Sequence, residues 1–190
     1  PWSELKYVGS YAQCYLMFEC RQKLLVIDQH AFHERILYEK LVNNRELVCQ
    51  SQPLLMPEQV ELAPTEVEFL VSQATELAKL GFQIEKHDDQ SVQVNGVPSL
   101  FANRNIAELI IALVEPSQDG QDFDNEKYSH YTLSTLACHS AIRAGEELPE
   151  DDLKLLIRDA QTVDFFHNCP HGRRVFRWWE HTQVAGWFDR

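Results

Sequence analysis

Thirteen consecutive residues, DQHAFHERILYEK at positions 28–40, gather side chains that can bind a metal ion or carry a proton. On a helix, His30 and Glu34 are four positions apart and share a face, while Asp28 precedes the first turn. Carboxylate and imidazole groups are common ligands of divalent cations. Taken alone, the stretch is equally compatible with a solvated helix face, because clusters of this kind are common on protein surfaces.

The other polar side chains of this stretch have a different expected role. Glu39 lies about 140° around a helix from Glu34, so it is not expected to bind the same ion. We expect Glu39 instead to brace the helix through Arg35 or Lys40. His33 and Tyr38, also in this stretch, receive no role from the sequence.

Two later stretches contain softer metal ligands. CPHGR at 169–173 places Cys169 and His171 in a turn made by a proline and a glycine. ACHSAIRA at 137–144 carries Cys138 on a predicted helix with small apolar neighbours. Each stretch alone has an ordinary explanation, namely a core cysteine or a buried thiol beside a surface imidazole.

Apolar periodicity and breaks at glycine and proline predict the elements that position these groups. Strands are predicted at 5–20 (two segments broken at Gly9), 23–27, 82–87 and 91–98, with an extended segment at 51–62. Helices are predicted at 30–43, 64–81, 105–116, 125–145 and 149–161, and the tail from 168 is predicted as a loop followed by a helix. A capping box of Thr65 with Glu68 is expected to start the second helix, and Gly145 to end the fourth.

This order of elements indicates an α+β fold with two lobes. The first and last thirds, residues 1–51 and 123–190, are expected to form a dimerisation and metal-binding lobe. The middle third, residues 52–122, is expected to form an inserted outer, regulatory lobe. The polar stretch at 116–126 is the best candidate for a linker between the lobes.

Composition narrows the functional classes. The net charge of -12 disfavours binding to nucleic acid phosphates unless metal ions or local basic residues offset it. The five cysteines form no regular framework, which favours reduced thiols and a cytoplasmic location. The longest apolar runs are too short to cross a bilayer, and the start without Met suggests a piece of a longer protein.

The three stretches together, in this order, resemble the C-terminal domain of the MutL family of DNA mismatch-repair proteins in its endonuclease-competent form. That family carries D-Q-H-A-x-x-E-x-x-x-x-E, which DQHAFHERILYE matches in full. It also carries A-C on a later helix and a C-P-H-G-R-P loop, and WFDR is similar to its short aromatic-x-arginine ending. The departure is Arg174, where the family usually has proline, which puts the stiffness of the loop in question and adds a charge suited to a phosphate.

The resemblance implies metal-dependent DNA nicking, with ligands around one or two divalent ions. The implied ligands are Asp28, His30, Glu34, Cys138, Cys169 and His171, with Asp28 and Glu34 as the catalytic carboxylates. The implied ions are Zn²⁺, largely structural or regulatory, and Mn²⁺ for nicking, with Mg²⁺ a further candidate. No residue is assigned as general base. The alternatives are a non-catalytic dimerisation module and a domain that only binds a structural or regulatory zinc.

The resemblance also implies partners: a second copy of the chain, DNA bound weakly, MutS and the sliding β clamp. QPLLMP at 52–57 resembles the segment by which bacterial MutL proteins dock on that clamp. Its aliphatic side chains, with Met56, suit apolar pockets, and its glutamine suits a polar anchor. The residues assigned to docking are Gln52, Leu54, Leu55 and Pro57. The alternative is a strand between the lobes whose leucines belong to the core.

Overall fold

The computed structural model describes residues 2–44, 50–118, 124–143, 145–163, 168–170 and 172–190. The chain divides into two compact units. The first unit combines the two ends of the chain, residues 1–39 and 141–190, and the second is the continuous stretch 40–140. Both units contain helices and an antiparallel sheet, so the α+β prediction is confirmed.

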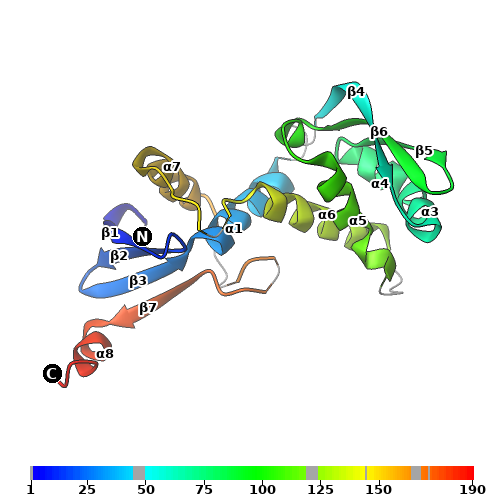
Figure 1. The fold of residues 1–190 in the computed structure, drawn as a ribbon. Coiled ribbons are helices and arrows are strands. Elements are labelled where there is room, and N and C mark those ends of the chain that lie inside the picture. The colour runs from blue at the N-terminus through cyan, green and yellow to red at the C-terminus, as the bar shows by residue number, and fades with distance from the viewer. Residues whose placement is uncertain (1, 45–49, 119–123, 144, 164–167, 171) are drawn as a thin grey trace. The chain divides into compact units, whose positions relative to one another are not determined.

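A four-stranded antiparallel sheet organises the first unit (Figure 1). Its strand order is β1-β2-β3-β7, with bounds Lys6–Tyr11, Tyr15–Cys20, Lys23–Asp28 and Phe176–Glu180. The helices are η1 (Trp2–Glu4), α7 (Glu150–Ala160), α8 (His181–Gly186) and α1 (Gln29–Asn43), of which α1 continues past residue 39. The strand β3 leads directly into α1, so the predicted strand-to-helix junction at Asp28 is confirmed.

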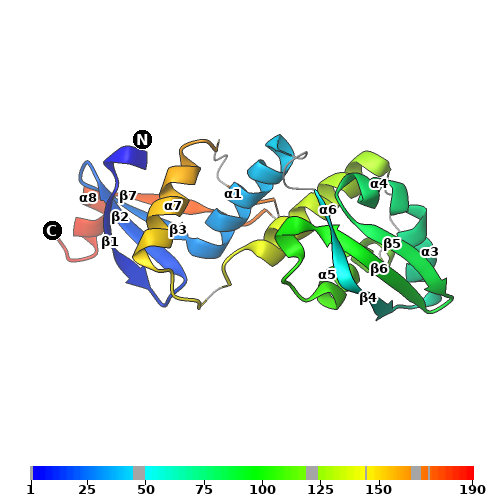
Figure 2. The same ribbon diagram turned by 90° about the horizontal axis from the view of Figure 1, so that it is seen from above.

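Helices α1 and α7 cover one face of this sheet, as Figure 2 shows. Alternate residues of β2 and β3 point into the core, where they meet apolar side chains of both helices. The core comprises Leu16, Phe18, Leu25, Ile27, Ala31, Phe32, Ile36, Leu153, Leu156, Ala160, Cys169 and Val175. The intervening residues form the opposite face, which we call the outer sheet face. It carries Tyr15, Met17, Leu24, Val26 and Trp179, together with the charged Glu19, Asp28 and Arg177.

The hairpin between β2 and β3 turns through two residues, Arg21 and Gln22, with φ of 49° and 62°. Positive φ at both turn positions produces the twist that a two-residue hairpin needs, although neither is the usual Gly or Asn. The strand β1 has an irregularity between Tyr7 and Gly9 where it pairs with β2. The predicted break at Gly9 is therefore a bulge within one strand.

The second unit is built on a three-stranded antiparallel sheet of order β4-β6-β5 (Figure 1). Its elements are β4 (Ser51–Glu61), α3 (Pro64–Ser72), α4 (Ala74–Lys79), β5 (Gln83–Asp88), β6 (Ser91–Pro98), η2 (Ser99–Phe101), α5 (Ile106–Gln118) and α6 (Asn125–Ser140). Helices α3, α4 and α5 contact the sheet. Helix α6 packs through Tyr128, a fully buried side chain whose hydroxyl donates to the Leu113 carbonyl of α5 at 3.1 Å.

Two predictions about the helix at 64–81 are wrong, and a third concerns the helix at 125–145. The helix predicted at 64–81 is two helices that meet at Gln73, although no glycine or proline marks that position. Its predicted Thr65–Glu68 capping box does not form, because Pro64 occupies the first helical position and Ala63 becomes the N-cap. The Ala63 amide donates instead to the Glu66 carboxylate at 2.8 Å.

The helix predicted to reach Gly145 ends at Ser140. The physical reason is that the amide and the carbonyl of Ile142 both bond to side chains of α1. These two groups therefore do not form the hydrogen bonds that would continue the helix. The tail also differs from its prediction, because β7 is a strand that pairs along β3 before α8 begins. The sequence FRWWE does not alternate clearly, so its pairing depends on β3.

The unit boundaries fall at 39/40 and 140/141, whereas the predicted lobes change over at 51/52 and 122/123. Helix α6 lies in the second unit because its buried face packs on α5. The regulatory role assigned to the middle of the chain stays a prediction. In the described part of the chain, no helix combines the length and the apolar character needed to cross a membrane.

Candidate functional site

Asp28 stands where β3 ends and α1 begins, and two hydrogen bonds hold it there. Its carboxylate Oδ1 accepts from the Ala31 amide at 2.9 Å, which makes Asp28 the N-cap of α1. Its own amide donates to the Val175 carbonyl at 2.9 Å. The Asp28 side chain is therefore set at the helix N-terminus, beside the strand that follows the CPHGR loop.

His30 and Glu34 lie together one turn into α1. The His30 Nε2 atom is 3.8 Å from a Glu34 carboxylate oxygen, and the side chains are 18% and 1% exposed. The His30 Nδ1 atom is 2.9 Å from the Ile142 carbonyl oxygen, which can only accept, so Nδ1 carries the proton. The neutral ring therefore presents the Nε2 lone pair toward a buried carboxylate.

This arrangement fits a divalent cation. Two acceptor atoms that face each other in a buried place are stabilised by a cation or by a second proton on the ring. A backbone carbonyl on Nδ1 is also the support that metal-binding histidines usually have, because it fixes the tautomer and the ring orientation. Nitrogen from His30 with oxygen from Glu34 suits Zn²⁺ or Mn²⁺.

His33 has the opposite hydrogen-bonding role to His30. Its Nδ1 accepts a hydrogen bond from the Ile142 amide at 3.1 Å, so in the neutral ring the proton is on Nε2. The two histidines thus bond to the same residue, His30 to the carbonyl and His33 to the amide of Ile142. Gln29, which is 2% exposed, adds a hydrogen bond from its Nε2 to the Glu146 carbonyl at 3.0 Å.

These bracing roles of His33 and Gln29 were missed by sequence reasoning. Their partners lie more than a hundred residues away along the chain, and no local pattern indicates them. By contrast, the expected brace at Glu39 is confirmed, because Glu39 pairs with Arg35 at 2.5 Å. Arg35 also lies over the Tyr38 ring, at 6.0 Å from its centroid.

Cys169 belongs to a tight hairpin that precedes β7. Its amide donates to the Arg173 carbonyl at 2.8 Å, and its carbonyl accepts from the Gly172 amide at 2.9 Å. Gly172 has a φ of 79°, a conformation that glycine adopts without strain. These bonds do not involve the side chain of Arg174, so the hairpin is held without a proline at that position.

The six implied ligands are distributed between the units. Among the described residues of the first unit, neither Asp28 nor Cys169 brings a ligand atom within 4.8 Å of both His30 and Glu34. Cys169 is 4% exposed and lies in the core of that unit. Cys138 is half-buried in the last turn of α6, in the second unit, and His171 lies outside the described residues.

The segment assigned to clamp docking is a large bulge in β4. Pro53 pairs with Gly96 and Glu58 pairs with Val94, so four residues of β4 oppose the single residue Asn95. Within the bulge, Leu55 is 105% exposed and Met56 is 81% exposed, while Leu54 is half-buried. Two apolar side chains are therefore held in solvent by a strand whose ends are fixed in the sheet.

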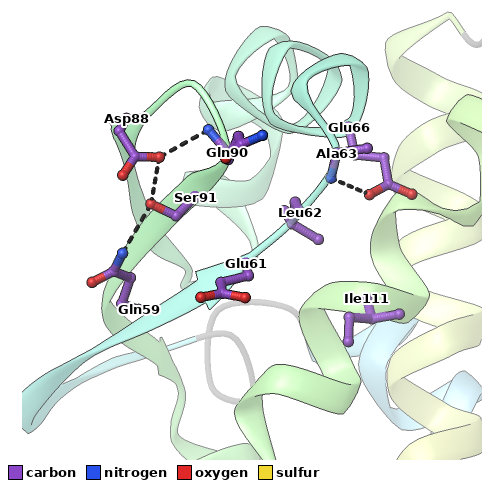
Figure 3. Close-up of a pocket in the computed structure, with 9 residues that line it drawn as sticks. All are labelled: Gln59, Glu61, Leu62, Ala63, Glu66, Asp88, Gln90, Ser91 and Ile111. Atoms are coloured by element: carbon purple, nitrogen blue, oxygen red, sulfur yellow. Dashed lines mark hydrogen bonds between the residues drawn. The ribbon is translucent and has the colours of Figure 1, made fainter.

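The second unit also contains an open pocket of about 590 Å³ (Figure 3). Two acidic side chains of its lining, Asp88 and Glu66, form hydrogen bonds with groups nearby in the chain. Asp88 accepts from the Gln90 amide and from the Ser91 hydroxyl, both at 2.8 Å, and these bonds hold the pKa of Asp88 below its ordinary value. The Glu66 carboxylate caps α3. The pocket therefore offers no arrangement comparable to that of His30 and Glu34.

Comparison with known proteins identifies the family of the chain. The profile of the family described as "MutL C terminal dimerisation domain" matches residues 8–148. The DNA mismatch repair protein MutL of Caldanaerobacter subterraneus is 34% identical over 189 residues, which cover 99% of this chain and 32% of that protein. The protein of the same name from Xanthomonas oryzae is 33% identical over 178 residues, 93% of this chain and 28% of its own length.

A third relative, the DNA mismatch repair protein MutL of Geotalea daltonii, is 30% identical over 190 residues, 99% of this chain and 32% of that protein. The fold defines the class as an α+β domain, and these relatives are DNA mismatch repair proteins. The chain belongs to the MutL C-terminal dimerisation domain family. It spans about a third of the length of the curated relatives that it matches.

Proposed function

We propose that this chain is a metal-dependent DNA-nicking domain that acts as a homodimer in mismatch repair. The observation that carries the proposal is the buried pair of His30 and Glu34, with the Nε2 lone pair of His30 directed at the carboxylate. The intact DQHA motif around this pair favours nicking over the alternative of a module that only dimerises. Nicking of supercoiled plasmid in the presence of Mn²⁺ tests the proposal.

The residues of the chain would divide the work as follows. His30, oriented by the Ile142 carbonyl, and Glu34 would hold the cation, with Asp28 at the neighbouring helix start. Cys169 and His171 would contribute from the hairpin, and Cys138 from the end of α6, as the resemblance implies. Bound divalent ions supply a nucleophilic hydroxide and stabilise the leaving oxygen in phosphodiester hydrolysis. The second candidate, a zinc site without catalysis, uses the same ligands and would show zinc binding without nicking.

Dimerisation is proposed to use the outer sheet face. Leu24 and Val26 of β3 lie there with Met17, and across β3 from them is Trp179, whose ring stacks edge-on against Trp187 at 5.2 Å. Trp187 is 57% exposed. Leu24 also lines a groove of about 480 Å³ beside α8. These apolar side chains form a cluster on a face that also carries Glu19 and Arg177. Such a cluster on the family's dimerisation domain is suited to a second copy.

Leu24→Lys is expected to convert the dimer to a monomer at tens of micromolar in sedimentation equilibrium. The new ammonium would be buried in the apolar interface, which weakens association by about 100-fold or more. The monomer itself tolerates the change, because Glu19 is the direct cross-strand partner of Leu24. Leu155→Lys is the matched control, since Leu155 is 46% exposed on α7 over the opposite face. A Leu24→Lys protein that remains dimeric would exclude the outer sheet face.

The bulge of β4 is proposed to dock on a sliding clamp. Its exposed Leu55, Met56 and Pro57 are available to an apolar pocket, and Gln52 is the adjacent polar group. Leu54, being half-buried, would contribute mainly by holding the bulge. An acidic domain recruited by a ring around DNA would not need strong DNA affinity of its own.

Leu55→Ser with Met56→Ser is expected to weaken binding to the β clamp more than about tenfold and to remove clamp stimulation of nicking. Because both side chains are solvent-exposed, the fold and the clamp-independent nicking rate should not change. Surface plasmon resonance with immobilised clamp measures the affinity. Leu100→Ser, at a position that is 46% exposed in the same unit, is the control. If the double variant binds the clamp as tightly as the wild type does, the segment is an ordinary edge strand and does not dock on the clamp.

A further inference from the structure

Two adjacent arginines, Arg173 and Arg174, lie exposed at the end of the Cys169 hairpin. Neither forms an ion pair within the part of the chain that the structure describes. Two other basic side chains of the same unit do: Arg21 bonds to Glu4 at 2.6 and 2.7 Å, and Lys23 pairs with Glu180 at 2.6 Å. Among the described residues, no carboxylate pairs with the two arginines, on a chain of net charge -12.

The backbone places this pair next to Asp28. The carbonyl of Val175, the residue after Arg174, accepts the hydrogen bond from the Asp28 amide. Neighbouring strands are about 4.8 Å apart and consecutive Cα atoms about 3.8 Å apart, so the Arg174 guanidinium lies within roughly 15 Å of the Asp28 backbone. That distance corresponds to a few nucleotides of one DNA strand.

The hairpin also gives these side chains a defined base. The bonds from the Cys169 amide to the Arg173 carbonyl and from the Gly172 amide to the Cys169 carbonyl close the turn, and Asn168 and Arg174 form a bridge across it. Arg174 is therefore fixed at its backbone and extended into solvent at its guanidinium. A planar guanidinium is the side chain best matched to phosphate oxygens.

We infer that Arg173 and Arg174 contact the DNA phosphates that flank the scissile bond and so position the strand at the Asp28 end of the site. The inference rests on the proposed nicking function, because it assigns the substrate-positioning residues of that same site. It also gives a strongly acidic chain a place to engage DNA: the net charge of -12 disfavours contact with phosphates, and these two arginines favour it. An acidic protein partner is the other ligand that such a pair could bind.

Binding of a fluorescently labelled DNA duplex, measured by anisotropy over a series of salt concentrations, tests the inference. Arg174→Gln should weaken binding by about threefold to tenfold at low salt and reduce the slope of log affinity against log salt by about one. Arg173→Gln with Arg174→Gln should reduce the slope by about two, and Arg174→Lys should keep most of the affinity. The measurement uses the full 190-residue chain, with zinc content and thermal melting recorded for each variant.

Arg21→Gln is the matched control, because it removes the same charge from an arginine already engaged by Glu4. The bond from Arg21 also holds the pKa of the Glu4 carboxyl below its ordinary value. An unchanged salt slope in the double variant, or an equal loss in Arg21→Gln, would overturn the inference. The inference would also be overturned if polyglutamate displaced the labelled duplex from the wild-type chain as efficiently as unlabelled duplex does. The ligand of the arginine pair would then be an acidic polypeptide.

The two proposals can fail separately. A wild-type chain that shows the arginine-dependent salt slope but does not nick plasmid keeps the inference and removes the nicking function. A chain that nicks in an Asp28-dependent manner with no arginine-dependent slope keeps the function and removes the inference. In the second case, KM for plasmid should also be unaffected by Arg174→Gln.

Discussion

Asp28→Asn is expected to reduce Mn²⁺-dependent nicking of supercoiled plasmid by at least about 100-fold. Asparagine keeps an oxygen that can accept from the Ala31 amide, so the N-cap of α1 survives. What the substitution removes is the negative charge that a cation needs at the helix start. The variant therefore separates the metal-binding role of Asp28 from its structural role.

Melting temperature checks that separation. Asp28→Asn should have the melting temperature of the wild-type protein. Asp28→Ala loses the cap as well, so its free energy of unfolding should fall by about 1 kcal/mol and its melting temperature by about 2–4 °C. Both variants should remain dimeric, because Asp28 lies at the opposite end of β3 from Leu24 and its cross-strand neighbour Trp179. Nicking by Asp28→Asn at the wild-type rate would show that the site drawn around α1 is not catalytic.

Glu34→Gln is expected to weaken zinc binding by more than about 100-fold in a chelator competition titration. The loss of a supporting residue around a metal ligand already costs 10- to 100-fold, so the loss of a direct ligand should cost more. Glutamine has nearly the same shape as glutamate, so the packing of a side chain that is 1% exposed is retained. The loss of zinc should therefore not be accompanied by unfolding, which far-ultraviolet circular dichroism would show.

Glu39→Gln is the matched control for this experiment. Glu39 lies on the same helix but pairs with Arg35, on a different side of α1 from Glu34. Its removal costs an ion pair and leaves zinc affinity unchanged. Cys169→Ser with His171→Ala should lose zinc as Glu34→Gln does. If Glu34→Gln and this double variant both bind zinc as the wild type does, the proposed ligand set is incorrect.

Several features of this protein are determined by its sequence locally. The start of α1 is one, because an aspartate before a helix accepts the amide bond that the first turn leaves unsatisfied. The pairing of His30 with Glu34 is another, because residues four apart on a helix share a face. The hairpins β2–β3 and β5–β6 also follow from short-range alternation and turns. The motifs at 28–39 and 169–173 were enough to indicate the family that the comparisons show.

Other features were decided only by the tertiary structure, because each depends on a partner remote in the chain. β7 is a strand because β3, about 150 residues earlier, offers its free edge. The opposite tautomers of His30 and His33 are set by the carbonyl and the amide of one residue, Ile142. Because these two groups bond to side chains, α6 ends before Ile142. The exposure of Leu55 and Met56 follows from the register between β4 and β6, which leaves four residues opposite one. Periodicity and capping act within a few residues, whereas strand partners, tautomers and bulges are set by atoms that folding alone brings near.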